Sequence, residues 1–422
     1  MINFSIAQSN RWLFGEEYVD VQAIIPNSPL PSLAGYTCFD GSGFNMRHDQ
    51  NNDLSFFIDG GVVYNENIVE LGRINVNTST GQAPFLGYPE ICIVPVPGAC
   101  SQYYIISANI YEGGGFDGTN PRPSFVTIDM DVYNTVANAY GSLLGANSGN
   151  WVISTDISNG SGTWTNFSVH TSEMHLAVTR PRSDGNRILF ISSGGQVYAS
   201  TITNSGISTA NLVFSTLNSN GSNPGSGVVK SELEVYEQQL NGVTSNYILA
   251  IPRGTTQNDI EVVNLDQNLN PINSFVVGPL ISSITNPLKG IEFSPNGQYI
   301  YYTTTVPDYL HCIDVSSGTS IQLPNINQSA LMKYGYSMIE TGIDNKLYMV
   351  CIDCSSPNNP NSHTIITQLN NPNNPSNLTF VDNWAELSTS HIAGFQSRQV
   401  FFATGNYVEL ILCLINRMAK IT

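Results

Sequence analysis

The 422-residue chain has little charge, and the charge that it has is mostly negative. Asp, Glu, Lys and Arg make up only 11% of the residues, with 15 basic against 32 acidic side chains and a net charge of −17. Because nucleic-acid affinity rests largely on Lys and Arg, this balance argues against a nucleic-acid partner. The sequence also lacks any apolar run of 18 or more residues, so it predicts no membrane span.

The common catalytic motifs are missing as well. The sequence contains no HExxH, no G-x-S-x-G elbow and no Walker A motif. The glycine cluster Gly113 to Phe116 lies between two predicted strands, which favours a loop tip over a phosphate cradle. We therefore predict no catalytic residue, no bound metal and no cofactor. The histidines are scattered one per segment: His48, His170, His175, His311, His363 and His391.

The cysteine pattern leaves its pairing open. The count of seven is odd, so the cysteines cannot all pair within one chain. Cys92 and Cys100 flank the turn Pro95 to Gly98, and a hairpin disulfide between them requires Cα atoms within about 7 Å. Cys312 alternates inside a predicted strand, as a small buried apolar residue would.

A second cysteine pair has metal-like spacing. Cys351 and Cys354 form a C-x-x-C that is followed by His363, yet no second motif supplies a fourth zinc ligand. A redox pair would need a helix N-terminus, whereas the neighbouring residues favour the end of a strand. We therefore favour a structural disulfide or thiols at Cys351 and Cys354 over a metal site.

What the chain does contain is turn-forming and aromatic residues, namely 36 Gly, 22 Pro, 20 Tyr and 18 Phe. This composition is typical of an all-β protein. The clearest unit begins with alternation over Ile291 to Phe293, followed by the turn residues Pro295 to Gly297. Tyr299 to Thr305 and Leu310 to Val315 then read as two further strands. The pattern predicts a three-stranded meander.

Six copies of this unit can be found along the chain. The last four middle strands begin 59, 52 and 48 residues apart, close to the period of about 40 to 50 residues expected for propeller blades. The interval Tyr133 to Ser172 is the least regular part, and we expect there either a long outer strand with an insertion or an elaborated loop. The predicted middle strands begin near Leu54, Tyr103, Ile188, Tyr247, Tyr299 and Leu347.

The two ends of the chain each supply half of a further blade. Arg11 to Phe14 and Tyr18 to Ile24 precede the first unit, and Ile392 to Phe395 and Gln399 to Ala403 follow the last. Pairing of the two halves would remove the exposed edges. We therefore predict an all-β, seven-bladed β-propeller closed by N- and C-terminal strands over residues 11–404, with a leader at 1–10 and a tail at 405–422. An open solenoid or two sandwiches are the alternatives.

Two carboxylate pairs are candidate sites. Asp129 with Asp131, and Asp259 with Glu261, lie two residues apart on one face of a strand, where they could bind Ca²⁺ or serve a glycosidase. An acid at the end of a strand more often caps a turn through backbone N–H groups. We favour this structural role, because similar acids close or follow third strands at Asp129, Asp266 and Asp314.

Four segments of the chain resemble a group of secreted propeller proteins of Bacteroidetes. They are NRWLFGEEYVDV, DLSFFIDGGVVYNENI, EICIVPVPGACSQYYIISA and GIEFSPNGQYIYYTT. The resemblance implies a seven-bladed, WD40-like propeller exported to the cell surface or medium, often with C-terminal adhesion domains and a type IX secretion tail. The chain departs from this pattern after Phe402, where no sorting domain is recognisable. Met1 to Gln8 looks like the end of a secretory signal or an ordinary leader.

Two functions remain open. The first is a non-enzymatic binding or adhesion scaffold, secreted or at the cell surface, that recognises a glycan or protein through its loops. The second is a hydrolase or lyase acting on polysaccharide or a lactone, with acidic or histidine side chains converging on the central channel. Such a site draws residues from several blades, so the sequence does not decide between the two.

Overall fold

The computed structural model describes strands and turns over most of the chain. Outside the described residues lie the first ten residues, the last 35 and several connections between strands. The described residues are 11–14, 17–20, 28–29, 44–48, 54–78, 81–84, 91–107, 123–145, 147–148, 151–160, 164, 174–193, 195–216, 233–240, 243–253, 259–277, 288–304, 310–323, 338–342, 344–352 and 364–387.

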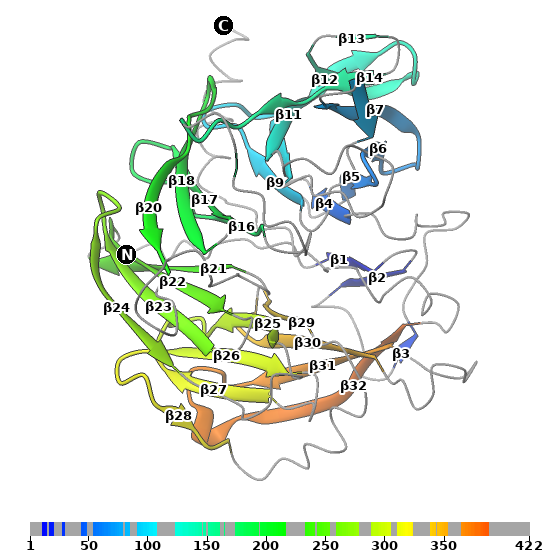
Figure 1. Cartoon of the computed structure of the whole chain (residues 1–422). Helices are drawn as coiled ribbons and strands as arrows, with labels where there is room; N and C mark the ends of the chain where they lie inside the picture. The colour runs from blue at the N-terminus through cyan, green and yellow to red at the C-terminus, as the bar shows by residue number, and fades with distance from the viewer. Residues whose placement is uncertain are drawn as a thin grey trace, which may run out of the picture.

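Among the described residues, six largely antiparallel sheets of four or more strands follow one another along the chain (Figure 1). Sheet I contains β4 (Phe44–His48), β5 (Leu54–Asp59), β6 (Val62–Asn65), β7 (Glu70–Thr78) and β8 (Gly81–Pro84). Sheet II contains β9 (Ile91–Pro95), β10 (Gln102–Ser107), β11 (Ser124–Asn134), β12 (Ala139–Leu144) and β15 (Thr155–Asp156). Sheet III contains β16 (Leu176–Val178), β17 (Arg187–Ser193), β18 (Gln196–Thr203), β19 (Gly206–Ile207) and β20 (Asn211–Ser215).

The last three sheets have the same design. Sheet IV contains β21 (Glu234–Leu240), β22 (Val243–Arg253), β23 (Asp259–Asp266) and β24 (Pro271–Val277). Sheet V contains β25 (Leu288–Phe293), β26 (Tyr299–Thr304), β27 (Leu310–Asp314) and β28 (Ser320–Ile321). Sheet VI contains β29 (Met338–Thr341), β30 (Leu347–Ile352), β31 (Thr364–Asn370) and β32 (Thr379–Leu387). A 3₁₀ turn, η1 (Pro375–Asn377), is the sole helical segment of the described residues, none of which forms a helix that could cross a membrane.

Each sheet packs face to face on the next one through a hydrophobic cluster. Sheets III and IV meet where Phe190 contacts Tyr247, with the two rings 6.0 Å apart. In β26 the side chains alternate, so that Ile300 packs toward sheet IV and Tyr301 toward sheet VI. A strand covered on both faces needs apolar residues at consecutive positions, which explains the run of aromatic residues in β26. In sheets II to V, burial thus follows from the position of each sheet between two others.

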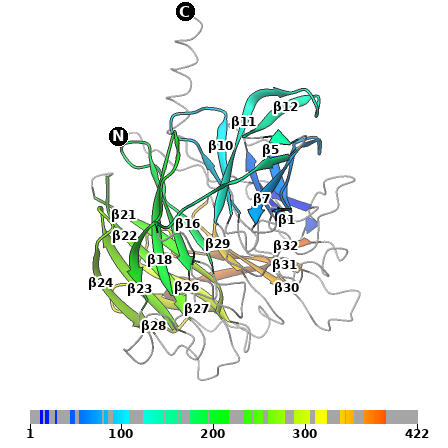
Figure 2. The same ribbon diagram turned by 45° about the horizontal axis from the view of Figure 1, so that its top comes forward.

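The sheets are arranged around a common centre, with the first strand of each sheet innermost (Figure 1). The tilted view shows sheets III to VI in the same order (Figure 2). First strands of several neighbouring sheets also contact one another, including β16 with β21 and β25 with β29. This is the arrangement of a β-propeller. We call "turn face" the side where the first strand of each sheet connects to the second, and the third strand connects to the fourth.

The N-terminal segment reaches both the first and the last sheet. β1 (Arg11–Phe14) pairs with β2 (Glu17–Asp20), and β1 also contacts β4. β3 (Ser28–Pro29) then runs parallel to the end of β32. The predicted partner strands, Ile392 to Phe395 and Gln399 to Ala403, lie outside the described residues. A seventh blade built from both ends of the chain therefore stays a prediction.

The least regular interval is an insertion that connects two sheets. β13 (Asn147–Ser148) and β14 (Trp151–Ile153) leave sheet II and extend sheet I, where β14 runs parallel to β7. The guanidinium of Arg73 lies 5.7 Å from the centroid of the Trp151 ring. The chain then returns to sheet II, where β15 pairs with β11. The interval that we expected to hold a long outer strand with an insertion or an elaborated loop therefore contains short strands that connect sheets I and II.

Candidate ligand-binding pocket

The acids at the ends of third strands cap turns, as the sequence predicted. Asp266 accepts hydrogen bonds from the backbone N–H groups of Asn268 and Asn270, each at 2.8 Å. Asp314 accepts the N–H groups of Ser316 and Ser317 at 2.8 and 3.0 Å. These hydrogen bonds lower the pKa of both carboxyl groups. Both acids therefore have a structural role on the turn face.

Asp129 also serves the local structure. Its carboxylate accepts hydrogen bonds from the Ser101 hydroxyl at 2.8 Å and the Gln102 amide at 2.9 Å. The backbone N–H of Asp131 donates to the same carboxylate at 3.0 Å. Burial raises the pKa of Asp129, but these hydrogen bonds outweigh it, and the net shift is downward. Asp129 and Asp131 thus lie in an irregular part of β11, where the carboxylate of Asp129 binds the backbone of Asp131.

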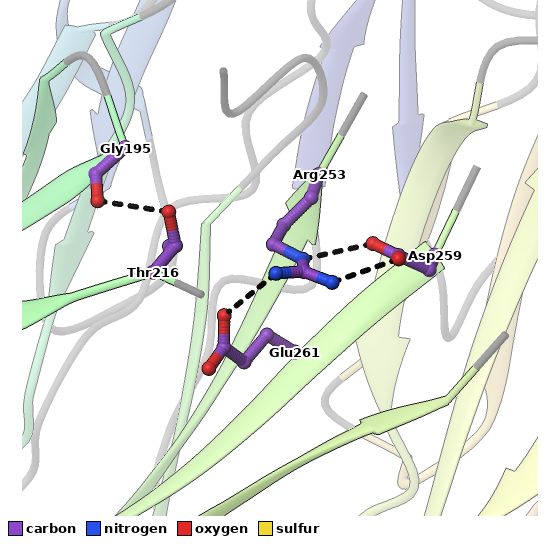
Figure 3. Close-up of polar contacts among 5 residues, drawn as sticks. All are labelled: Gly195, Thr216, Arg253, Asp259 and Glu261. Atoms are coloured by element: carbon purple, nitrogen blue, oxygen red, sulfur yellow. Dashed lines mark hydrogen bonds and ion pairs between the residues drawn. The ribbon is translucent and has the colours of Figure 1, made fainter. Parts of the chain in front are cut away.

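Asp259 and Glu261 both bind one buried arginine (Figure 3). Arg253 and Asp259 face each other across β22 and β23, and the guanidinium donates to both carboxylate oxygens at 2.9 and 2.8 Å. Glu261 adds an ion pair at 3.3 Å. All three side chains are buried. Loss of the arginine would leave two buried carboxylates facing each other, so the acids hold the core of sheet IV together.

The cysteines do not form the hairpin disulfide that the sequence left open. Cys100 is disulfide-bonded, whereas Cys92 and Cys312 are thiols. Cys92 lies opposite Ile106, four residues along β10 from Gln102, so it is roughly 13 Å along the strand from the turn that carries Cys100. A bond between Cys92 and Cys100 is therefore not formed. In the second predicted pair, Cys351 lies in β30, where its side chain is not described, and Cys354 lies outside the described residues.

The histidines that the structure describes do not converge. The ring of His311 stacks on Tyr302 with centroids 4.7 Å apart, and burial lowers the pKa of His311 to about 4. His175 is buried and its backbone N–H donates to the Ser192 hydroxyl. Among the described residues no group of three or more His, Cys, Asp or Glu side chains could hold a metal ion.

Carboxylates on three innermost strands are the feature that sequence reasoning missed. Glu237 of β21 accepts the backbone N–H of Arg180 from sheet III. Glu292 of β25 accepts the N–H of Thr341 from sheet VI at 3.0 Å, and it is hydrogen-bonded to Glu340. Burial raises the pKa of Glu237, and it raises the pKa of Glu292 to about 7.

These carboxylates do not assemble into a glycosidase site. Glu237 is directed toward sheet III and Glu292 toward sheet VI, so they lie on opposite sides of the pair of sheets that carries them. Glu292 and Glu340 are within hydrogen-bonding distance, whereas the two carboxyl groups of a retaining glycosidase are about 5 Å apart and those of an inverting one farther. Both Glu237 and Glu292 instead join neighbouring sheets.

A pocket of ≈ 200 Å³ opens on the turn face between sheets III and IV. One wall is the connection from β16 to β17, and the other consists of β21, β22 and the turn after β23. The pocket is lined by Pro181, Arg182, Ser183, Gln239, Thr244, Tyr247 and Gln267.

Tyr247 and Arg182 offer polar groups that the fold itself does not use. The Tyr247 side chain is 1% exposed, and its hydroxyl makes no hydrogen bond with any described residue. Burial raises the pKa of Tyr247, so the phenol stays protonated and can donate. The guanidinium of Arg182 likewise makes no hydrogen bond or ion pair within the described part of the chain. Both groups lie in the lining of the pocket.

The surroundings hold these two side chains in place. The Tyr247 ring packs edge to face on Phe190 in the core between sheets III and IV. Two backbone hydrogen bonds close the turn that carries Arg182: the Arg182 N–H donates to the Asn186 carbonyl at 2.7 Å, and the Gly185 N–H donates to the Arg182 carbonyl at 2.9 Å. Thr244 donates to Glu237 at 3.2 Å. The site is therefore formed before any ligand arrives.

One feature of the sequence pointed to this turn. Arg180 and Arg182 are two of only 15 basic residues in the chain, and they lie two positions apart. The residues after them, Ser183 to Gly185, indicate a turn and nothing more. Tyr247 lies more than sixty residues away on another sheet, so its part in the pocket could not be read from the sequence.

Comparison with known proteins adds little to this geometry. No family model and no curated protein matches the chain. Solved structures that resemble it include the Dos1 propeller (11% identity, 82% of this chain and 73% of that one, TM-score 0.39). Others are the Cps50 (Swd1) β-propeller domain of Myceliophteria thermophila (10%, 75% and 94%, 0.32) and the GH74 enzyme of Niastella koreensis (14%, 81% and 46%, 0.41). At these scores the architecture rests on the strand pairing and packing described above.

Proposed function

We propose that this protein is a non-enzymatic binding module that recognises a glycan through the pocket between sheets III and IV. The observation that carries the proposal is the Tyr247 hydroxyl, which a buried ring holds in the lining of the pocket and which makes no hydrogen bond within the described residues. A ligand hydroxyl could accept a hydrogen bond from it. Such a bond contributes about 0.5–1.5 kcal/mol net.

The lining suits a sugar better than an apolar ligand. Gln239 and Gln267 bring amide donors and acceptors, Ser183 and Thr244 bring hydroxyls, and Tyr247 adds an aromatic edge. Ligand pockets for drug-sized molecules usually measure about 300–1,000 Å³, so a volume of ≈ 200 Å³ suits a smaller group. One sugar unit of a longer chain fits this description, with the rest of the chain lying across the turn face.

The proposal includes export of the protein and closure of the ring. A disulfide at Cys100 supports an oxidising compartment, because such bonds are rare in the cytosol. The resemblance to secreted propellers of Bacteroidetes supports the same location, at the cell surface or in the medium. β1 and β2 lie between the first and last sheets in Figure 1, where a seventh blade would close the ring.

The alternative function, a hydrolase or lyase acting on polysaccharide or a lactone, is less well supported. It requires acids or histidines that converge on one reacting centre. The carboxylates of β21 and β25 are directed to different neighbouring sheets, and each is bound by backbone N–H groups. A reaction on a bound sugar would need a different set of residues.

Tyr247→Phe tests the proposal, since it removes the hydroxyl and keeps the ring. On a glycan array followed by calorimetry, we expect the wild type to bind an oligosaccharide and the variant to bind it roughly 3- to 10-fold more weakly, as loss of one hydrogen bond implies. Tyr140→Phe is the matched control, because Tyr140 is exposed on sheet II and should leave binding unchanged.

Three results would contradict the proposal. One is the absence of any bound glycan on the array. Another is equal affinity of the wild type and Tyr247→Phe for the same oligosaccharide. The third is turnover of a panel of chromogenic glycosides, which would favour the hydrolase alternative.

A further inference from the structure

We infer that the pocket selects an acidic glycan, whose carboxylate or sulfate group is bound by the guanidinium of Arg182. This inference rests on the proposed glycan-binding function and names the ligand class of the same site. It follows from the charges around the pocket, from the partners of each charge and from the geometry of the turn that carries Arg182.

Arg182 is the one charged side chain in the lining of the pocket. It is partly buried and makes no hydrogen bond or ion pair with the described residues. The chain has 15 basic residues against 32 acidic ones, yet none of the described acids forms an ion pair with this arginine. A guanidinium presents a planar fork of donors that matches a carboxylate and also binds sulfate-like oxyanions. An acidic ligand group would supply the partner that the fold does not.

The neighbouring acids accept hydrogen bonds from other groups and not from this arginine. Glu237 is occupied by the Arg180 N–H and the Thr244 hydroxyl, and burial raises its pKa. Asp184 accepts the backbone N–H of Asn186 at 3.0 Å and its side-chain amide at 3.1 Å.

Two further arginines lie near the pocket. Arg187 is buried behind the turn and donates to the Thr179 carbonyl at 3.0 Å. Arg180 and Arg187 both interact electrostatically with Glu237. No acid lines the pocket, so Arg182 is the charge that a ligand in the pocket meets.

Because the whole protein is negatively charged, its preference for an acidic ligand should depend on short-range contacts. A polyanion is repelled at a distance, so binding depends on the contact with Arg182 and not on long-range attraction. The preference for an acidic sugar should therefore persist at physiological salt, where charges beyond about 8 Å are screened.

The test compares ligands that differ only in charge. Calorimetry is done with an oligogalacturonide and its methyl ester, and with a galactose oligosaccharide with and without sulfate. We expect the wild type to bind an acidic member of at least one pair about 10-fold or more tightly than its neutral counterpart. The two pairs show whether a carboxylate or a sulfate is preferred.

The variant Arg182→Gln should remove this preference and keep binding of the neutral sugar. Arg180→Gln is the matched control, because it removes a nearby charge that does not line the pocket. We expect it to keep the preference for the acid. Circular dichroism and thermal melts establish that both variants fold.

The outcomes separate this inference from the proposed function. Equal binding of acidic and neutral sugars by the wild type, or an unchanged preference in Arg182→Gln, overturns the acidic ligand and leaves glycan binding in place. The acidic ligand is equally overturned if Arg180→Gln loses the preference and Arg182→Gln retains it. Failure of the wild type to bind any of the four ligands, together with an empty array, overturns both.

Discussion

At the scale of single residues, Glu292 makes the stability of the junction between sheets V and VI depend on pH. Its carboxylate accepts the N–H groups of Phe293 at 2.7 Å and Thr341 at 3.0 Å, and it is hydrogen-bonded to Glu340. The Thr341 hydroxyl donates back to the Phe293 carbonyl at 3.3 Å. Burial raises the pKa of Glu292 from 4.5 to about 7. Glu292 and Glu340 therefore share a proton, and the two carboxyl groups are not both charged.

The raised pKa predicts how stability changes with pH. The folded protein binds the proton of Glu292 more tightly than the unfolded chain, so the stabilisation is complete below pH 4.5 and is lost as the pH rises through about 7. Compared with Glu292→Gln, the wild type should lose on the order of 2 kcal/mol of unfolding free energy between pH 5 and pH 8. Urea unfolding at both pH values measures this.

The control for this prediction is Glu66→Gln, an exposed carboxylate on the turn face of sheet I. It should keep the pH dependence of the wild type, because this exposed side chain lies far from the junction of sheets V and VI in the order of the sheets. If Glu292→Gln also keeps the pH dependence of the wild type, Glu292 does not carry the proton, and another group of the junction is responsible for the effect.

Residue roles were readable from the sequence where they depend on neighbours along the chain. The turn caps Asp266 and Asp314 are such cases, because their partners lie two to four positions ahead. Tyr247, Arg182 and Glu292 are not, since each acquires its role from a sheet that is remote in sequence.

At the scale of elements, strands were predictable because each middle strand is buried on both faces. β5, β26 and β30 begin at Leu54, Tyr299 and Leu347, which are the predicted starts. Apart from sheet II, where a long outer strand was one of two expectations, the fourth strand of each sheet was missed. β28 is only two residues long and β24 is mostly exposed, so neither has the apolar alternation that marks a strand.

Contacts between a turn and the neighbouring sheet should limit which residues can occupy the turn. Gly297 in the turn after β25 has φ +68°, and a Cβ atom there would lie 2.1 Å from Cε1 of Tyr236 in sheet IV. Gly98 in the corresponding turn of sheet II has φ +74°, but a Cβ atom would meet nothing within 4 Å. Both positions carry the same backbone strain, and only the first adds overpacking.

Gly297→Ala should therefore lower the free energy of unfolding by about 1–3 kcal/mol more than Gly98→Ala does. Urea unfolding of the two variants gives the comparison directly. Equal losses would mean that Tyr236 can move away and that the junction between sheets IV and V is not tightly packed at the turn face.

At the scale of the whole molecule, the order of the sheets was predictable and the closure of the ring was not. Six repeats of one pattern predict six similar sheets, whereas closure depends on contacts between the ends of the chain. The structure adds an N-terminal contribution that the sequence did not indicate, since β3 extends sheet VI at Ser28 and Pro29. Two residues leave no periodic signal, and their role exists only when β32 is beside them.

The N-terminal segment should therefore stabilise the whole ring. Deletion of residues 1–29 removes β1 with its contact to β4, and it removes β3 from the edge of β32. Exposed strand edges favour pairing with other chains, so the truncated protein should melt at a lower temperature and aggregate more readily. Differential scanning calorimetry with light scattering measures both. Deletion of residues 407–422 is the control and should change neither. If the deletion of residues 1–29 leaves the melting temperature unchanged, sheets I and VI stabilise the ring without the N-terminal segment.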